Sequence, residues 1–170
     1  MEAVNDRFEI HANGGKILQS DIGLPLRVKS RALAEALAEV WLESGPKARN
    51  QDMPMVRLAI NADPSIIDRS NIERLILMYA ETDLICYRAA EKEKNLEQLQ
   101  KEMWDPLLKW ILNKYDAKLE VTTGIMPFKQ TKRALNSLSQ AVKECSNNEL
   151  SALYQATITS SSLVIGLAQK

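Results

Sequence analysis

Hydrophobic and polar residues alternate along the first thirty positions of the chain, which is the pattern of β-strands with one buried face. Phe8, Ile10 and Ala12 fall on one side of such a strand, and His11 falls on the other. The sequence NGG at residues 13–15 favours a hairpin turn, because Asn and Gly adopt positive φ at low cost. A second turn at DIGLP and a short strand at LPLRV complete the predicted β-rich segment.

The period changes at Ser30, where an amphipathic helix is predicted to begin and to end at Gly45 and Pro46. Ser30 is a suitable N-cap residue for this helix. A shorter helix is predicted to follow, with Asp52 as its cap and Pro54 near its first turn. The apolar stripe of the first helix consists of Leu33, Leu37, Val40 and Trp41.

The stretch at residues 65–89 is predicted to be one continuous helix, in which Tyr79, Asp83 and Tyr87 are four residues apart and share a face. The pattern puts Asp83 on the buried side, where a carboxylate is costly unless it is paired and hydrogen-bonded. Two interpretations stay open: a polar clamp between helices, or a partner-binding patch rich in Tyr, Arg and Trp. The candidate partners of a clamp are Arg88, Arg57 and Arg74.

The chain then predicts a helix over residues 96–115, which Pro106 should kink or divide, because proline lacks the backbone donor. LEVTT at residues 119–123 is a strand candidate that either joins the N-terminal sheet or links helices. Residues 129–145 and 147–168 predict two further helical segments. The side chains of the first of these helices expected to face inward are Leu96, Leu99, Met103, Leu107, Trp110 and Ile111.

These elements predict an α+β fold, in which a small N-terminal β-rich unit is followed by a mostly α-helical body. We place the β-rich unit with its one helix at residues 1–47 and the helical domain at residues 48–170. A chain of 170 residues is long enough for two such packed parts.

The net charge of zero argues against a general nucleic-acid surface, which needs a basic excess. No apolar run is long enough to cross a membrane, and the N-terminus lacks the apolar region of a signal peptide. A cytoplasmic bacterial location, or prior processing, fits these features. Cys86 and Cys145 are isolated in the sequence and are expected to be reduced packing residues.

Catalytic motifs are absent from the sequence. His11 is the only histidine and has no local nucleophile motif, and neither a zinc-ligand spacing nor a phosphate-binding loop occurs. We therefore expect no cofactor and no metal. Two carboxylates, Asp83 and Asp105, lie among aromatic residues and are the best pair for a small enzyme with both groups in one cleft.

Several stretches together resemble one family. SRALAEALAEVW, YAETDLICYRA and WDPLLKWILNKYDAKLEVTTGI occur in the order and spacing of the F-type ATP synthase assembly chaperones that bind the alpha subunit in mitochondria and alphaproteobacteria. MPMVRLAINADP and SSSLVIGLA resemble two further family segments. Members usually continue beyond the last of these with an acidic segment and a W-G motif. We therefore expect this chain to be a shortened member or a piece of one, and its binding to be weak if the acidic segment takes part in capture.

The resemblance implies a non-catalytic chaperone, located in the bacterial cytoplasm or, for eukaryotic relatives, in the mitochondrial matrix. It would bind the free alpha subunit and protect its assembly surface until the beta subunit replaces it, without nucleic acid or membrane insertion. A generic protein-interaction domain is a further alternative. Trp41 matches the family but is expected to be core. The candidate partner contacts among the matching residues are Asp83, Tyr87, Arg88, Trp104 and Asp105.

Overall fold

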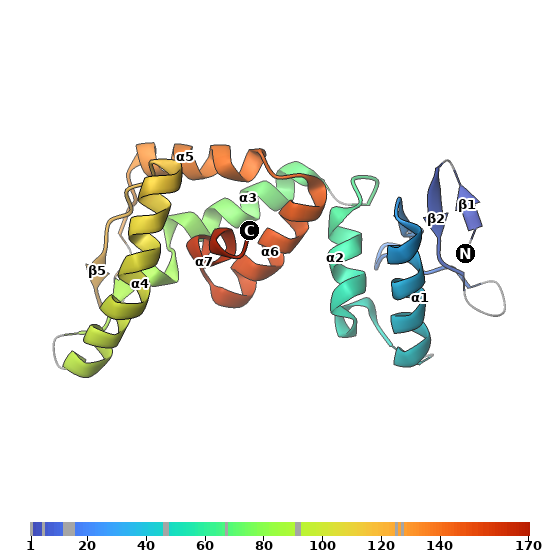
Figure 1. Ribbon diagram of the computed structural model, residues 1–170, viewed down its shortest axis with the longest axis horizontal. Helices are drawn as coiled ribbons and strands as arrows, with labels where there is room; N and C mark the ends of the chain where they lie inside the picture. The colour runs from blue at the N-terminus through green and yellow to red at the C-terminus, as the bar shows by residue number, and fades with distance from the viewer. Residues whose placement is uncertain are drawn as a thin grey trace. The chain divides into compact units, whose positions relative to one another are not determined.

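The computed structural model divides the protein into two compact units, Met1–Arg69 and Ser70–Lys170. The structure describes residues 2–4, 6–11, 16–45, 48–66, 68–90, 93–124, 126 and 128–170. Short strands occur in both units, but helices predominate in the described part of the chain (Figure 1). The predicted α+β class is confirmed.

The first unit begins with an antiparallel sheet in the order β1-β2-β3 (Figure 1). Ile10 is fully buried and Phe8 is partly buried, as the alternation predicts. The predicted NGG turn lies outside the described residues. The predicted second turn is present, since the Ser20 amide donates to the Leu24 carbonyl and Gly23 has φ of 82°. The strands are β1 (Glu2–Val4), β2 (Arg7–Glu9) and β3 (Arg27–Val28).

The helix α1 spans Arg31–Ser44, and the Ser30 hydroxyl caps it by accepting a hydrogen bond from the Leu33 amide. A 3₁₀ turn, η1 (Asn50–Asp52), leads into α2 (Pro54–Ala62). Asp52 was predicted to cap this helix, and that prediction is wrong.

The position preceding α2 is Met53, which makes no side-chain cap. The Asp52 carboxylate instead binds the backbone and the guanidinium of Arg49, at 3.2 Å from each. Pro54 occupies the first turn of α2 as predicted. Proline fits there because the first backbone N–H groups of a helix have no intrahelical partner.

The core of the first unit joins the sheet, α1 and α2. Val28, Leu37 and Val56 come from these three elements and belong to one buried cluster, against which Trp41 packs. This agrees with the expectation that Trp41 is a core residue. Because α2 completes this cluster, the boundary predicted between residues 47 and 48 falls inside the first compact unit.

The second unit begins with α3 (Arg69–Glu81), a 3₁₀ turn η2 (Leu84–Cys86) and a strand β4 (Tyr87–Arg88). The predicted helix through Tyr87 is therefore wrong. The Asp83 side chain accepts a hydrogen bond from the Ile85 amide, which starts the 3₁₀ turn and ends the α-helical path. Asp favours such caps because its carboxylate competes for backbone donors.

The helix α4 (Lys94–Tyr115) runs through Pro106, so no new helix begins there. Ile111 is buried as predicted. Leu96, Leu99 and Met103 are not: they are 45%, 55% and 63% exposed. Their predicted inward orientation is wrong, because they follow a stripe of their own that is turned away from the side carrying Ile111.

The strand β5 (Thr122–Thr123) confirms the LEVTT candidate. It lies between α4 and α5, as one of the two alternatives predicted, and it does not join the N-terminal sheet. It lies parallel to β4, with Tyr87 opposite Thr122 and Arg88 opposite Thr123. Gly124 follows at φ of 85°, and its amide donates to the Arg88 carbonyl. The two short strands thereby connect the segments on either side of α4.

Three helices close the chain: α5 (Lys132–Lys143), α6 (Asn147–Ser160) and α7 (Leu163–Ala168). The last two divide the predicted C-terminal helical segment at Ser161, which has φ of 55°. They pack closely, because a Cβ on Gly166 would lie 2.7 Å from the Thr157 hydroxyl oxygen. A search of the described helices finds no segment with the length and hydropathy needed to cross a membrane.

Candidate functional site

Asp83 lies at the junction of α3, η2 and α7, and no part of it is exposed to solvent. One carboxylate oxygen accepts from the Ile85 amide at 3.3 Å, and the other accepts from the Val164 amide at 3.0 Å. Burial raises the pKa of this carboxyl, while hydrogen bonds from Ser162 and the two amides oppose the rise. Asp83 therefore caps both η2 and the first turn of α7.

The clamp interpretation is thus half right. Asp83 does join separate elements, but it does so through backbone amides. Arg88 makes its ion pair with Asp105 instead, and Arg74 donates to Asn71 at 2.8 Å. Short carboxylate-to-backbone contacts satisfy the buried group without a paired cation.

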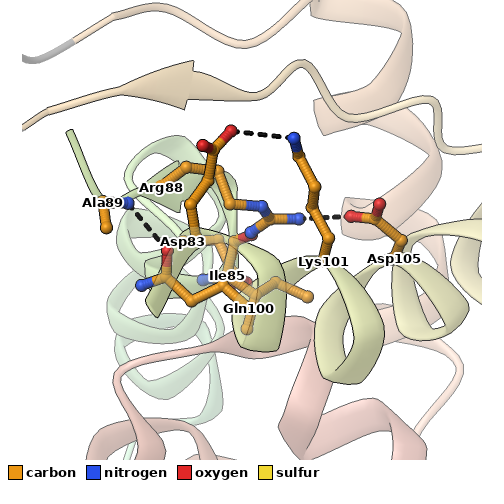
Figure 2. Close-up of polar contacts among 8 residues, drawn as sticks. Asp83, Ile85, Arg88, Ala89, Gln100, Lys101 and Asp105 are labelled. Carbon is orange, nitrogen blue, oxygen red and sulfur yellow. Dashed lines mark hydrogen bonds and ion pairs between the residues drawn. The ribbon is translucent and has the colours of Figure 1, made fainter. Parts of the chain in front are cut away.

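Arg88 is the second of the predicted contact residues that is buried, with only 4% of its side chain exposed. Figure 2 shows the guanidinium directed toward Asp105, where Nη2 lies 2.6 Å from a carboxylate oxygen. The other terminal nitrogen donates to the Ile85 carbonyl. The guanidinium carbon also lies 5.2 Å from the centre of the Trp104 ring, a cation–π distance. Arg88 therefore connects η2 and β4 to α4.

A further contact strengthens the same junction. The Gln100 side-chain oxygen accepts from the Ala89 amide at 2.7 Å (Figure 2). Glu97 and Lys101 form an ion pair at 2.8 Å on the neighbouring turn. Gln100 was missed by sequence reasoning, since a lone glutamine on a helix carries no signal for a contact with another segment.

The three remaining predicted residues are only partly covered. Tyr87 packs edge-to-face on Phe128, with ring centres 5.4 Å apart. Trp104 is half-buried under Arg88. Asp105 is the most open member of the set, with 57% of its side chain exposed. The structure thus brings Arg88, Trp104 and Asp105 into contact, whereas Asp83 faces α7.

This geometry does not favour a two-carboxylate reaction. Asp83 is sealed from solvent and Asp105 is open, so the pair does not face one shared cleft. Burial also raises the pKa of the Cys86 thiol to about 12, which suppresses its thiolate form. In the part of the chain that the structure describes, no cluster of three His, Cys, Asp or Glu side chains is placed to hold a metal ion.

The fold is that of an α+β protein with a small antiparallel sheet and a separate helical unit. Comparison with known proteins narrows this class to one family. The profile described as ATP12 chaperone protein matches residues 1–112. The chain belongs to the ATP12 chaperone family, and the resemblance seen in its motifs is confirmed.

Solved structures agree with this assignment. Atp12 from Paracoccus denitrificans is 30% identical, with a TM-score of 0.73 over 96% of this chain and 73% of that one. A mutant of Atp12p from the same organism is 31% identical, with a TM-score of 0.73 over 91% of this chain and 66% of that one. A putative chaperone from Agrobacterium tumefaciens is 28% identical, with a TM-score of 0.75 over 96% and 64%. The chain thus spans about two thirds of the length of the last two proteins.

Proposed function

We propose that the protein is an assembly chaperone for the F-type ATP synthase, and that it binds the free alpha subunit until the beta subunit takes its place. The observation that carries the proposal is membership of the ATP12 chaperone family, supported by solved structures that cover nearly all of this chain. We place this activity in the bacterial cytoplasm, the counterpart of the mitochondrial matrix for eukaryotic relatives.

The proposed chaperone would cover the exposed interface of a newly made subunit for a limited time. A subunit made before its partner exposes an interface that is apolar and prone to self-association. A chaperone that occupies this interface and then yields to the permanent partner needs no chemical step. The proposal therefore requires a protein surface and not a catalytic centre, in keeping with the lack of catalytic motifs in the sequence.

We propose that the predicted contact residues divide into two roles. Tyr87, Trp104 and Asp105 are at least partly open and are candidates for touching the alpha subunit. Asp83 and Arg88 are buried and hold the framework in place. Asp83 joins η2 to α7, and Arg88 joins β4 to α4. Tyr and Trp are among the residue types enriched at interface hot spots, where such side chains become fully desolvated on binding.

The first experiment is capture of the alpha subunit, expressed alone, by the tagged chain. We expect a stable complex, and we expect Asp105→Asn to weaken capture several-fold. Asp116→Asn is the matched control, because Asp116 is another exposed aspartate of this unit that pairs with an arginine, at 2.5 Å from Arg133. Equal loss in both variants would remove Asp105 from the contact set. Failure of the unaltered chain to bind alpha would contradict the proposal.

A further inference from the structure

The exposed side of α4 carries apolar residues at alternating intervals of three and four. This is the spacing at which one helix packs along another, with every apolar residue on a single seam. These five residues, which we call the α4 stripe, are Leu96, Leu99, Met103, Pro106 and Trp110. The first four are exposed to solvent, and Trp110 is half-buried.

The stripe lies apart from the contacts that hold α4 to its own unit. Gln100 and Trp104 face β4 and Arg88, and Ile111 is fully buried. Figure 1 shows the first turns of α4, in yellow-green, extending away from α6 and α7. A half-exposed apolar seam of this length is costly to keep in water and is typical of docking surfaces.

The charges beside the stripe indicate what covers it. Glu102 and Lys109 lie on the outer flank of the seam, one heptad apart, and both are exposed. When two copies of this helix pack antiparallel, Met103 of one copy lies opposite Pro106 of the partner subunit. Glu102 then lies beside Lys109 of the partner subunit, and Lys109 beside Glu102 of the partner subunit. Both flanking pairs are attractive.

Other registers lose this match. A shift of one heptad places Leu99 opposite Met103 of the partner subunit, but it brings the two Glu102 side chains together, which is repulsive. A parallel pair places each residue beside its own copy and gains no Glu–Lys contact directly across the seam. The net charge of zero adds no general repulsion between copies.

We infer that the α4 stripe is a self-association surface, on which a second copy of this chain docks its own α4 antiparallel through a two-fold axis near residues 104–105. Such an interface is isologous, because the same surface serves both copies. The inference stands on the stripe and its flanking charges and is independent of the proposed chaperone function.

The test is the mass of the chain in solution by sedimentation equilibrium across a range of concentrations. We expect a monomer–dimer equilibrium in the micromolar range, and we expect Leu99→Glu to weaken association by tenfold or more. Leu112→Glu is the matched control, since Leu112 is an exposed leucine of the same helix that lies off the stripe. A chain that is monomeric at every concentration would overturn the inference, as would equal effects of the two variants.

The charges provide a second, independent test. Glu102→Lys alone should weaken the dimer, because it places two lysines together on each flank. The double variant Glu102→Lys with Lys109→Glu should restore association to the original strength. Weakening without restoration would contradict the antiparallel register.

Orientation can be tested by cross-linking under mild oxidation. Met103→Cys lies next to the two-fold axis and should form a disulfide between copies. Leu96→Cys should not, because the two copies of this position are separated by about 25 Å along the seam at about 1.5 Å of rise per residue. The two native cysteines are buried and give little background. Cross-linking at both positions would indicate a parallel pair and overturn the antiparallel arrangement.

Discussion

Two regions of the second unit each contain an aspartate from a family motif, and the two aspartates differ in their exposure to solvent. At the junction with α7, Asp83 is sealed from solvent and bound by backbone amides. On α4, Asp105 is more than half exposed and bound by an arginine. The comparison shows that a charged residue in a family motif serves either the fold or the surface, and that burial decides which.

The largest effect is expected at Asp83. Asp83→Ala leaves the amides of Ile85 and Val164 buried without their acceptor, and each such loss costs about 1–3 kcal/mol. We expect the free energy of unfolding to fall by about 2–4 kcal/mol, measured by urea denaturation.

Asp83→Asn is the control for this change. Asparagine keeps the shape and one acceptor oxygen, so it should cost clearly less than alanine. Equal losses in the two variants would show that Asp83 acts through its charge and not as a cap. A melting temperature unchanged by Asp83→Ala would remove the residue from the framework altogether.

A smaller effect is expected at Arg88. Arg88→Met keeps the buried aliphatic part but removes the donors to Asp105 and to the Ile85 carbonyl. We expect a loss of about 1–2 kcal/mol, because a buried carbonyl then lacks its partner. Arg133→Met is the comparison, since Arg133 forms an ion pair with Asp116 in which both side chains are mostly exposed. That change should leave the unfolding midpoint unaltered, and similar losses in the two variants would contradict the role given to burial.

The smallest effect concerns pH, and its sign differs between two carboxyls. The pKa of Asp83 is raised by burial, so the folded state binds its proton more readily than the unfolded state. Its contribution to stability is therefore fully present below pH 3.8 and is lost as the pH rises through the folded pKa. The unaltered chain should gain stability relative to Asp83→Asn as the pH is lowered toward 4.

Glu149 behaves in the opposite way. Hydrogen bonds from Ser146 lower its pKa from 4.5 to about 2, with a smaller contribution from Lys170. Its stabilising contribution is present above pH 4.5 and is lost as the pH falls toward 2. The difference between the unaltered chain and Glu149→Gln should therefore shrink on acidification, measured by denaturation between pH 7 and pH 3. A difference that grows would contradict the capping box at the start of α6.

The sequence predicts much of this fold because some signals are local. Ser30 and Pro54 act within a few residues of their own position, and the structure places both as expected. Helical periodicity fails between Asp83 and Tyr87, where the carboxylate captures the Ile85 amide and the apolar spacing continues by coincidence. The partner of β5 was also missed, because the pairing of Tyr87 with Thr122 depends on distant segments.

The candidate site shows the same limit. Arg88 and Asp105 belong to two different sequence motifs that resemble the family. Their separation along the chain does not indicate that the two side chains pair. Apolar spacing on α4 predicts a stripe correctly but not whether that stripe faces the core. Leu99 and Met103 follow the pattern of a buried seam and are exposed, because helical spacing shows which residues share a face but not what that face packs against.

We propose that this chain covers the alpha subunit and then yields it to the beta subunit, and one measurement tests this directly. The tagged chain is first bound to the free alpha subunit, and purified beta subunit is then added while release of alpha is followed by size-exclusion chromatography. We expect alpha to leave the tagged chain and to elute with beta. Retention of alpha on the chain in the presence of excess beta, or a stable complex of all three, would contradict it.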